Sequence, residues 1–324
     1  MPKAEGVRSL MQPQRVAVVG AGAVGSYFGM RLAEAGHDVR FLMRRDYDAV
    51  KSGGLHLSSH LGDLFLDAPI VERTPEALAA HGPVDWVLVG LKATAIPDIP
   101  KLVGPLLSEG TRVLAIMNGL SVDEEIAAEL PAGTSLFGGL GFIGVIRGEP
   151  GQILHQEFGA INLGHHGDDP DELQRGVDLF AGSKVEIRPE PSLLKARWEK
   201  LCWNIPFNGL CVIAGGVPVD QVIEDPPLYD AAHELIKEIV AAGNADLEAH
   251  GQSARIDGPR IAHLFLTQTL GMGAYRPSTV IDYNNGRPLE LDAIFRQPVQ
   301  RASQLGIGVP MMSMVASLVG KLGD

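Results

Sequence analysis

The feature of the sequence that most constrains the fold is a glycine-rich turn between an apolar run and a helical pattern. Residues 15–20 read RVAVVG, and the turn itself, residues 20–25, reads GAGAVG. The helical pattern covers residues 23–36 and stops at Gly36. A valine-rich run, a G-x-G-x-x-G turn and a helix in direct succession are typical of a β-α-β unit. The sequence therefore predicts a parallel sheet with helices on its faces.

The first half of the chain repeats this alternation. Further continuous apolar runs, which predict strands, occur at residues 38–43, 86–91 and 112–117. Helical patterns suited to the crossovers between strands occur at residues 75–81, 94–107 and 121–130. Because the apolar runs do not alternate with polar residues, we expect both faces of the sheet to be covered. The glycine-rich residues 135–164 contain short strand-like runs and are expected to extend the sheet as hairpins.

The second half of the chain is helical in character. Residues 185–191 read VEIRPEP, and their prolines suit a linker. The helical patterns beyond this linker cover residues 192–214, 227–250, 258–270, 289–305 and 311–321. We therefore predict an α/β fold, with a Rossmann-type dinucleotide-binding domain at 15–190 followed by an all-helical C-terminal domain at 191–324. Residues 1–14 lack the apolar core of a signal peptide and are interpreted as a mobile tail.

Charge and cysteine content limit the partners and the compartment. The formal net charge of −12 argues against nucleic acid and anionic membranes as partners. No apolar run reaches the roughly 18 residues that a membrane span needs. Cys202 and Cys211 lie too far apart along one predicted helix to bridge, so we expect a reducing cytoplasm. The histidines show no metal-ligand spacing, so no metal is expected; a homodimer is one possible oligomeric state, which the sequence leaves open.

The glycine turn is a candidate site for a nicotinamide dinucleotide. Gly20 allows the tight turn, Gly22 lets the backbone approach a pyrophosphate, and Gly25 lets the helix pack close to the strand. The N–H groups at the start of the helix are suited to phosphates. The alternative is a glycine-rich turn that binds nothing. The candidate cofactor-binding residues of this turn are Gly20, Ala21, Gly22, Ala23, Val24 and Gly25.

The end of the second predicted strand bears on the choice of cofactor. An NAD site usually has Asp or Glu there to bind the ribose 2′-OH. Here the strand is followed by Arg44 and Arg45, and guanidinium groups favour the 2′-phosphate of NADPH/NADP+. Asp46 lies close by and keeps NAD open, and a solvated surface pair is the alternative interpretation of the two arginines.

Two further polar residues directly follow predicted strands. Lys92 comes after WVLVGL and Asn118 after RVLAIM. Because ligands of open α/β sheets bind outside the carboxyl ends of the strands, both can meet the nicotinamide half of the cofactor or the substrate. The alternatives are an exposed lysine and an ordinary Asn-Gly turn.

The first helix of the second half carries a narrow polar stripe. Arg197, Lys200, Asn204 and Asn208 are spaced three, four and four apart, which places them on one face of a largely apolar helix without an acidic residue among them. Buried polar groups must be hydrogen-bonded, so the stripe is expected to line a ligand site. The alternative is a stripe that docks on the other domain. Pro206 is expected to kink this helix.

Together these residues resemble a known family, the ketopantoate reductases (2-dehydropantoate 2-reductases), from about Arg15 to near the C-terminus. The matching pieces are GAGAVG (20–25), the LMR that ends in Arg44, LKA (91–93), IMNG (116–119), W-x-K-L-x-x-N-x-x-x-N (198–208) and S-x-x-x-D (278–282) with Glu290 beyond. The resemblance implies NADPH-dependent reduction of a small-molecule 2-oxo acid. In this family ketopantoate is reduced to D-pantoate for pantothenate and coenzyme A, at a site between the two domains.

The resemblance also implies roles for single residues. Lys200 falls on the catalytic lysine, and an ammonium at that place can stabilise the developing oxyanion and donate the proton as a general acid. Glu290, which we expect in the first turn of a helix, is implied to hold Lys200 or the substrate hydroxyl. Substrate-binding positions fall on Asn118, Asn204, Asn208 and Ser278. Cofactor-binding positions fall on Arg44 and Lys92, and also on Asn118.

Three residues depart from the family pattern. They are Tyr275, Thr279 and Pro206, and they leave the acyl group of the substrate open. Alternatives to the ketopantoate reaction are therefore a paralogous reductase of another 2-oxo acid or imine, and a non-catalytic NADP-binding redox sensor. Lys200 separates the enzymes from the sensor, because a sensor needs no lysine at a reacting carbonyl.

Overall fold

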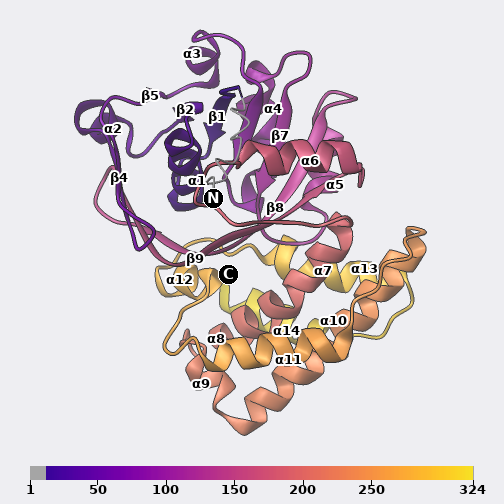
Figure 1. Ribbon diagram of the computed structural model, residues 1–324. Helices are drawn as coiled ribbons and strands as arrows, with labels where there is room; N and C mark the ends of the chain where they lie inside the picture. Colours follow the sequence, from indigo (N-terminus) through magenta and orange to yellow (C-terminus); the bar gives the residue numbers. More distant parts are fainter. Residues whose placement is uncertain (1–11, 324) are drawn as a thin grey trace, which may run out of the picture.

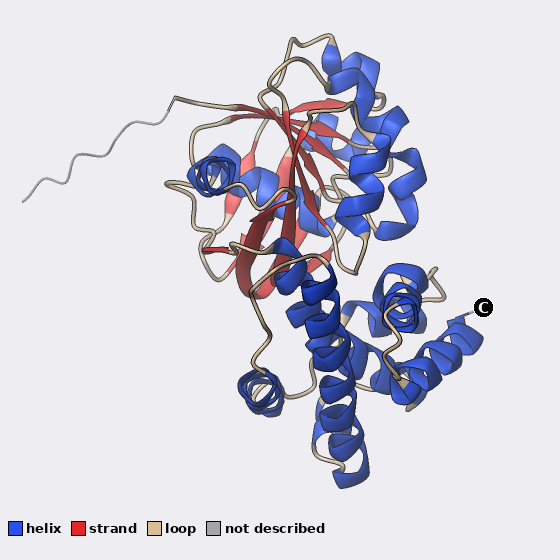
Figure 2. Ribbon diagram, turned by 90° about the vertical axis from the view of Figure 1, so that its right-hand side faces the viewer, coloured by secondary structure: helices blue, strands red, loops and turns tan. Residues whose placement is uncertain are grey.

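A computed structural model of the chain describes residues 12–323 (Figure 1). The first half contains one ten-stranded sheet, and Figure 2 shows helices packed on both of its sides with the helical half below it. The strands, in the order in which they lie side by side, are β4 (Leu64–Leu66), β3 (Leu55–Ser59), β9 (Gln152–His165), β8 (Ser135–Arg147), β7 (Arg112–Ile116), β6 (Trp86–Val89), β1 (Arg15–Val19), β2 (Asp38–Leu42) and β5 (Ile70–Glu72), with β10 (Ile187–Pro189) paired to β9.

Both faces of the sheet are covered, as the continuous apolar runs predict. Val16 and Val18 of β1 belong to one core cluster, while Ala17 and Val19 belong to another. The first cluster includes side chains from the helices α1 (Ala23–Glu34) and α6 (Pro170–Leu179). The second includes side chains from α3 (Pro75–Ala79), α4 (Ile99–Val103) and α5 (Val122–Glu129). Alternate residues of a strand point to opposite faces, so the strand is buried on both.

The hairpin expected in residues 135–164 is confirmed. Strands β8 and β9 pair antiparallel over their length, and the pairing is interrupted by register shifts after Phe142 and after Gly144. Beyond this hairpin, β3 and β4 extend the sheet, and neither of them was predicted from the sequence. These strands are short and lie at the edge, and exposed residues such as His56 and Phe65 weaken their apolar signal.

Three helical segments of the first half differ from the expected pattern. Residues 94–107 form three short pieces instead of one helix: η1 (Ala93–Asp98), α4 and η2 (Gly104–Leu106). Prolines in this segment remove backbone donors and shorten each piece. The helices α2 (Tyr47–Gly53) and α6 were not predicted.

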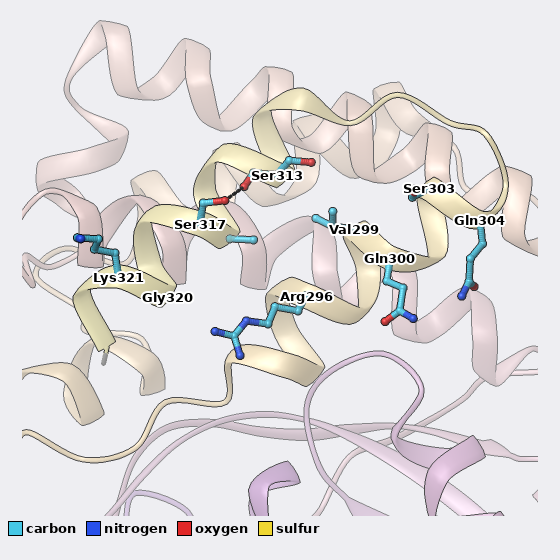
Figure 3. A pocket seen from close by; sticks show the side chains of 10 residues that line it. Arg296, Val299, Gln300, Ser303, Gln304, Ser313, Ser317, Gly320 and Lys321 are labelled. Carbon is cyan, nitrogen blue, oxygen red and sulfur yellow. Dashed lines mark hydrogen bonds between the residues drawn. The ribbon is translucent and has the colours of Figure 1, made fainter.

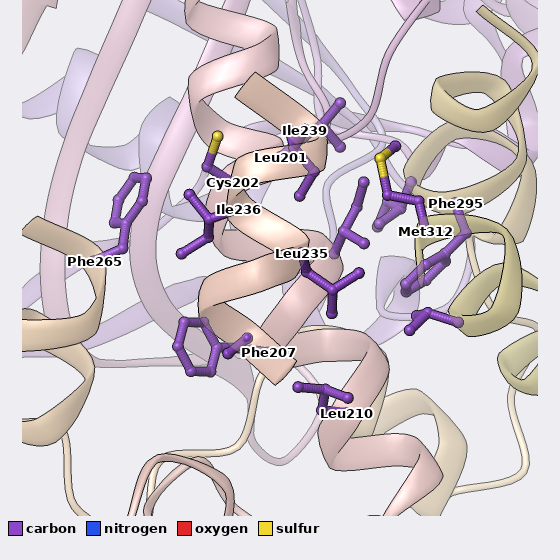
Figure 4. Packing of buried hydrophobic residues seen from close by; sticks show 14 of the residues in the cluster. Leu201, Cys202, Phe207, Leu210, Leu235, Ile236, Ile239, Phe265, Phe295 and Met312 are labelled. Carbon is purple, nitrogen blue, oxygen red and sulfur yellow. The ribbon is translucent and has the colours of Figure 1, made fainter. Parts of the chain in front are cut away.

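The second half is helical throughout. Its elements are α7 (Leu193–Trp203), η3 (Asn204–Asn208), α8 (Gly209–Ile213), α9 (Asp220–Ile223), α10 (Pro226–Ala249), α11 (Gly258–Leu270), α12 (Ser278–Asn284), η4 (Asp292–Arg296), α13 (Gln297–Gln304) and α14 (Pro310–Gly323). Helix α10 lies at the centre, where Leu235, Ile236 and Ile239 pack among side chains of the neighbouring helices (Figure 4). The short helix α9 was not predicted, whereas α12 begins at Ser278, where the sequence indicates a helix start after Pro277. The domain boundary near residue 190 stays a prediction, with β10 ending at Pro189 and α7 beginning at Leu193.

Pro206 lies in a continuous helical segment, within a π turn that the kink expected at this residue does not by itself indicate. Helices α7 and α8 are joined by η3, a single π-helical turn that contains Pro206. In a regular α-helix the proline ring meets the carbonyl four residues earlier. A wider π turn relieves that contact, and it changes the angle between Lys200 and Asn208 that a regular helix would give.

Four further expectations concern the tail, the thiols, membranes and metals. Residues 1–11, most of the expected mobile tail, lie outside the described residues, whereas Gln14 is tied to the sheet because its carbonyl accepts a hydrogen bond from the Asp38 N–H. Cys202 and Cys211 are buried and unbridged. None of the helices within residues 12–323 is long and apolar enough to cross a membrane. The same residues contain no group of three or more His, Cys, Asp or Glu side chains suited to a metal.

Candidate active site

The glycine turn has the shape that a pyrophosphate needs. Gly20 has a φ of +87°. A Cβ at Gly25 would clash with the Gly20 carbonyl oxygen, and a Cβ at Gly90 would lie 2.7 Å from the Gly25 Cα, so neither Gly25 nor Gly90 could carry a side chain. A Cβ added to Gly22, by contrast, would meet no protein atom within 4 Å. Helix α1 starts at Ala23 with no side-chain cap and no acidic residue in its first turn. The N–H groups and the positive end of the helix dipole are therefore open to an anionic group.

Arg44 and Arg45 lie beside this turn at the end of β2. Both are exposed, and neither forms a hydrogen bond or an ion pair with another described residue. Asp46 is buried and paired with Arg147 of β8 at 2.5 Å. The carboxylate of Asp46, which left NAD open as the cofactor, is thus neutralised by Arg147. The guanidinium groups of Arg44 and Arg45 next to it remain available for a 2′-phosphate.

The loops that follow β6 and β7 contact the helical domain. Lys92 forms an ion pair with Asp282 of α12. The N–H of Ala93 donates to the Glu290 carboxylate at 2.8 Å. The N–H of Leu120, two residues after Asn118, donates to the Ala293 carbonyl at 2.8 Å. The carboxyl ends of two strands and the segment around Glu290 are therefore held together.

Glu290 lies just before a helix rather than in its first turn, where we expected it. The helical conformation begins at Leu291, and the Glu290 carboxylate turns to the Ala93 N–H in place of the N–H groups of its own helix. Burial raises its pKa, while the Ala93 N–H and the nearby Lys92 act in the opposite direction. Glu290 makes no hydrogen bond to Lys200 within the described part of the chain.

The polar stripe is buried along its whole length, and its first member is a docking residue. Arg197 donates from Nε and Nη2 to the two carboxylate oxygens of Asp123 at 2.7 Å, and from Nη1 to the Met117 carbonyl. Asp123 lies on α5 in the first domain. The acidic partner that the stripe lacks in its own helix is therefore supplied from the other domain, as the docking alternative predicted for the stripe.

Lys200 has different surroundings. Its side chain is buried, with Nζ donating to the Gly141 carbonyl at 3.0 Å and lying 3.4 Å from the centre of the Phe142 ring. No carboxylate of residues 12–323 pairs with it. Burial lowers the pKa of Lys200 to about 7, so that both protonation states are accessible near neutral pH, as proton transfer requires.

The two asparagines of the stripe differ in how their polar atoms are satisfied. The Oδ1 atom of Asn208 accepts a hydrogen bond from the Thr279 N–H at 3.1 Å, next to Ser278 at the uncapped start of α12. The Nδ2 atom of Asn204 is buried and has no hydrogen-bond partner in the described chain. An unpartnered buried donor costs roughly 1–3 kcal/mol, and a ligand oxygen would remove that cost.

Of the predicted site residues, Lys92, Lys200 and Glu290 make contacts across the domain junction, and the structure adds other residues there. Asp123, Gly141 and Phe142 were not predicted, and Asp282 was part of a matched motif without an assigned role. The stripe itself signalled the missing acid for Arg197, but no local pattern marks Gly141 or Phe142 as neighbours of Lys200.

A surface hollow lies elsewhere, between α13 and α14 (Figure 3). It has a volume of about 900 Å³, and its lining includes Arg296, Gln300, Ser317 and Lys321. None of the predicted site residues lines it. The domain junction is therefore kept as the candidate site.

A Rossmann-type domain joined to a helical domain, with a buried lysine at the junction, defines a dinucleotide-dependent oxidoreductase. Residues 16–168 match the family described as "Ketopantoate reductase PanE/ApbA", and residues 192–323 match its C-terminal counterpart. The chain belongs to the ketopantoate reductase family, whose members act on a CH–OH group.

Individual relatives agree with this assignment. A 2-dehydropantoate 2-reductase from Nostoc sp. is 34% identical, with 94% of this chain and 93% of the relative covered. A crystal structure of 2-dehydropantoate 2-reductase from Geobacter metallireducens has a TM-score of 0.89 and 39% identity, covering 95% of this chain and 99% of that one. A second, from Methylococcus capsulatus, has a TM-score of 0.84 and 28% identity, covering 95% and 96%.

Proposed function

We propose that the protein reduces 2-dehydropantoate (ketopantoate) to D-pantoate with NADPH, and that Lys200 is the general acid. The observation that carries the proposal is a buried ammonium without a carboxylate partner, on the same helix as the unpartnered amide of Asn204. A 2-oxo acid supplies an oxygen for both groups. The names of the relatives described above support the particular substrate.

The proposed reaction needs one hydride and one proton. The bound nicotinamide supplies the hydride to the ketone carbon. The charge that develops on the ketone oxygen is stabilised by the Lys200 ammonium, which then donates its proton and leaves the alcohol and a neutral amine. Solvent reprotonates the amine before the next turnover.

The other predicted residues orient the substrate in this proposal. Asn204 donates from Nδ2 to a substrate oxygen, and Asn208 has its amide nitrogen available after Oδ1 is used by Thr279. Ser278 and Asn118 offer further hydrogen bonds without adding charge. Glu290, whose pKa burial raises, accepts from or donates to the substrate hydroxyl according to its protonation.

The Lys200→Ala variant tests the assignment of the general acid. We expect turnover to fall by several orders of magnitude while NADPH binding, measured by fluorescence titration, stays close to wild type. Lys195→Ala is a matched control, because Lys195 lies on the same helix and pairs with Glu199. Undiminished NADPH consumption by Lys200→Ala would refute the assignment.

The wild-type pH profile is a second test of Lys200. The reduction requires the protonated amine, and the pKa of Lys200 is lowered to about 7. We therefore expect kcat/KM for reduction to be constant on the acid side and to fall as pH rises through about 7. A profile that stays level up to pH 9 would mean that another group donates the proton.

The cofactor preference is tested at Arg44. We expect Arg44→Ala to raise the KM for NADPH by about 10- to 100-fold, because it removes a charge-assisted bond to the 2′-phosphate, and to leave the KM for NADH unchanged. Arg45→Ala, at the adjacent and equally exposed position, is expected to have a smaller effect. Wild-type protein that oxidises NADH as efficiently as NADPH would contradict the proposal.

Another 2-oxo acid is the second candidate substrate. It is favoured by Tyr275, which lies against Trp203 at 6.3 Å between ring centres and gives this side of the helical domain an aromatic surface. A panel of 2-oxo acids that includes ketopantoate and phenylglyoxylate, together with cyclic imines, separates the candidates by kcat/KM. Failure to oxidise NADPH with every member would favour a redox sensor.

A further inference from the structure

We propose that Phe142 on strand β8 is a positioning residue for Lys200. Its ring and the carbonyl of Gly141 fix the ammonium and favour its charged form. They take the place that a carboxylate partner would otherwise have beside the lysine. The inference rests on the role proposed for Lys200 and adds what holds that group at the junction.

The contacts of Lys200 come from two consecutive residues of one strand. The Gly141 carbonyl accepts one of the three N–H groups at 3.0 Å, and the Phe142 ring lies 3.4 Å from Nζ. The face of an aromatic ring carries partial negative charge and attracts a cation at this distance. With one proton on the carbonyl and the ring covering another side, a direction remains for the ketone oxygen.

The backbone of β8 explains why the ring reaches the lysine. The pairing of β8 with β9 shifts register immediately after Phe142 and again after Gly144. A β-bulge re-aims the neighbouring side chain and is common beside active sites. Phe142 belongs to the sheet of the first domain, yet it packs against the core of the helical domain. The ring therefore crosses the domain junction to meet α7.

The charged groups on the elements around Lys200 have other partners. On its own helix, Arg197 pairs with Asp123 and Glu199 pairs with Lys195. Two carboxylates from other segments of the helical domain are also engaged, Glu290 by the Ala93 N–H and Asp282 by Lys92. Burial is the one cause that lowers the pKa of Lys200. Besides the Gly141 carbonyl, the Phe142 ring is thus the nearest group that favours the charged form of Lys200.

An aromatic partner suits an anionic substrate better than a carboxylate would. A carboxylate beside Lys200 would raise the pKa of the amine, weaken it as an acid and repel the carboxylate of a 2-oxo acid. The quadrupole of a ring gives a smaller stabilisation and carries no net charge. Phe142 therefore holds the ammonium in place without cancelling the attraction between Lys200 and the anionic substrate.

The test alters the ring electronically with little change in its shape. Phe142 is replaced by mono-, di- and trifluorophenylalanine, because each fluorine weakens the negative face of the ring. The pKa of Lys200 is measured by NMR titration of ¹³C-labelled lysine, with the signal assigned from Lys200→Arg. We expect the pKa to fall stepwise with fluorine number, by about half a unit to one and a half units in all.

Conventional variants test the same inference in turnover. Phe142→Leu keeps an apolar side chain but removes the ring, so the pH at which kcat/KM falls is expected to shift to lower pH by a similar amount. Phe142→Tyr keeps a ring and should restore the wild-type profile. Phe65→Leu is the matched control, since Phe65 is stacked on His56 at the far edge of the sheet and should leave the profile unchanged.

Two outcomes would overturn the inference. The first is a Lys200 pKa that does not change across the fluorinated series. The second is a loss of kcat in Phe142→Leu that is uniform with pH, which would indicate a packing role alone. Because the NMR titration needs no turnover, its result is independent of whether Lys200 is the general acid. If Phe142→Leu fails to fold, the fluorinated series still decides.

Discussion

Arg197 and Lys200 lie one turn apart on the same helix, both are buried, and their surroundings are opposite. Arg197 has a bidentate carboxylate partner in Asp123, whereas Lys200 has a carbonyl and a ring. The first arrangement holds a charge permanently and fixes the domains. The carbonyl and the ring around Lys200 allow the ammonium to lose its proton. The difference between a structural and a reactive cation is therefore made by residues outside the helix.

Removing the structural cation is expected to cost stability. Arg197→Ala leaves the carboxylate of Asp123 buried and unpaired, so we expect the free energy of unfolding to fall by about 3–5 kcal/mol in urea titration. Arg188→Ala, which breaks the exposed pair with Glu186, is the control and should cost much less, because solvent screens that pair. Equal losses in the two variants would show that the buried pair has no special weight.

The sequence predicted single residues where the signal was local. The spacing of Lys200, Asn204 and Asn208 along one helix was visible as a polar stripe. The partners were not, because Asp123 lies 74 positions from Arg197 in the chain and Gly141 lies 59 positions from Lys200. Contacts of this kind form when the two domains dock. No local sequence pattern around either residue of a pair predicts its partner.

At the scale of elements, helix α6 is attached to the sheet by one carboxylate. Glu172 accepts hydrogen bonds from Arg112 of β7 and from Ser135 of β8. These contacts, chiefly the bond from Arg112, lower the pKa of Glu172 to about 2. A helix that the sequence did not predict is thus fixed by an ion pair as well as by its apolar face.

The pH dependence of stability follows from the sign of this shift. A lowered pKa means that the folded state favours the carboxylate, so the stabilisation is present above the unfolded pKa of about 4.5 and is lost as pH falls towards 2. We expect Glu172→Gln to be less stable than wild type at pH 6 and the difference to shrink between pH 4.5 and 2. Solvent screening keeps the effect modest. Thermal unfolding across this range measures it, and a difference that grows at low pH would contradict the assignment.

Elements with a strong apolar period were predictable, and those shaped by neighbours were not. The core strands, the β8–β9 hairpin and the long helix α10 follow directly from their patterns. The π turn at η3 does not, because Pro206 alone indicates a kink, whereas the turn's residues Ile205 and Phe207 are buried in the core of the helical domain. The edge strands β3 and β4 likewise depend on pairing with the hairpin.

At the scale of the whole molecule, the candidate site exists only while the two halves are docked. Lys92 with Asp282, Ala93 with Glu290 and Arg197 with Asp123 all join the first domain to the second. Arg301 of α13 adds a contact to Glu124 of α5. The glycine turn belongs to the first domain and Lys200 to the second, so in the proposed reaction the cofactor and the general acid meet through the docking of the domains.

The two buried cysteines allow the opening of the helical domain to be measured as a rate of alkylation. Burial raises the pKa of Cys202 and Cys211, the latter to about 12, so neither thiol is reactive in the folded protein. Iodoacetamide should therefore modify the protein only when the helical domain opens. If NADPH binds only the folded state, then at a concentration 100 times its Kd the rate of alkylation should fall about 100-fold. Each thiol thus reports how often the helical core opens, and no label has to be introduced into the protein.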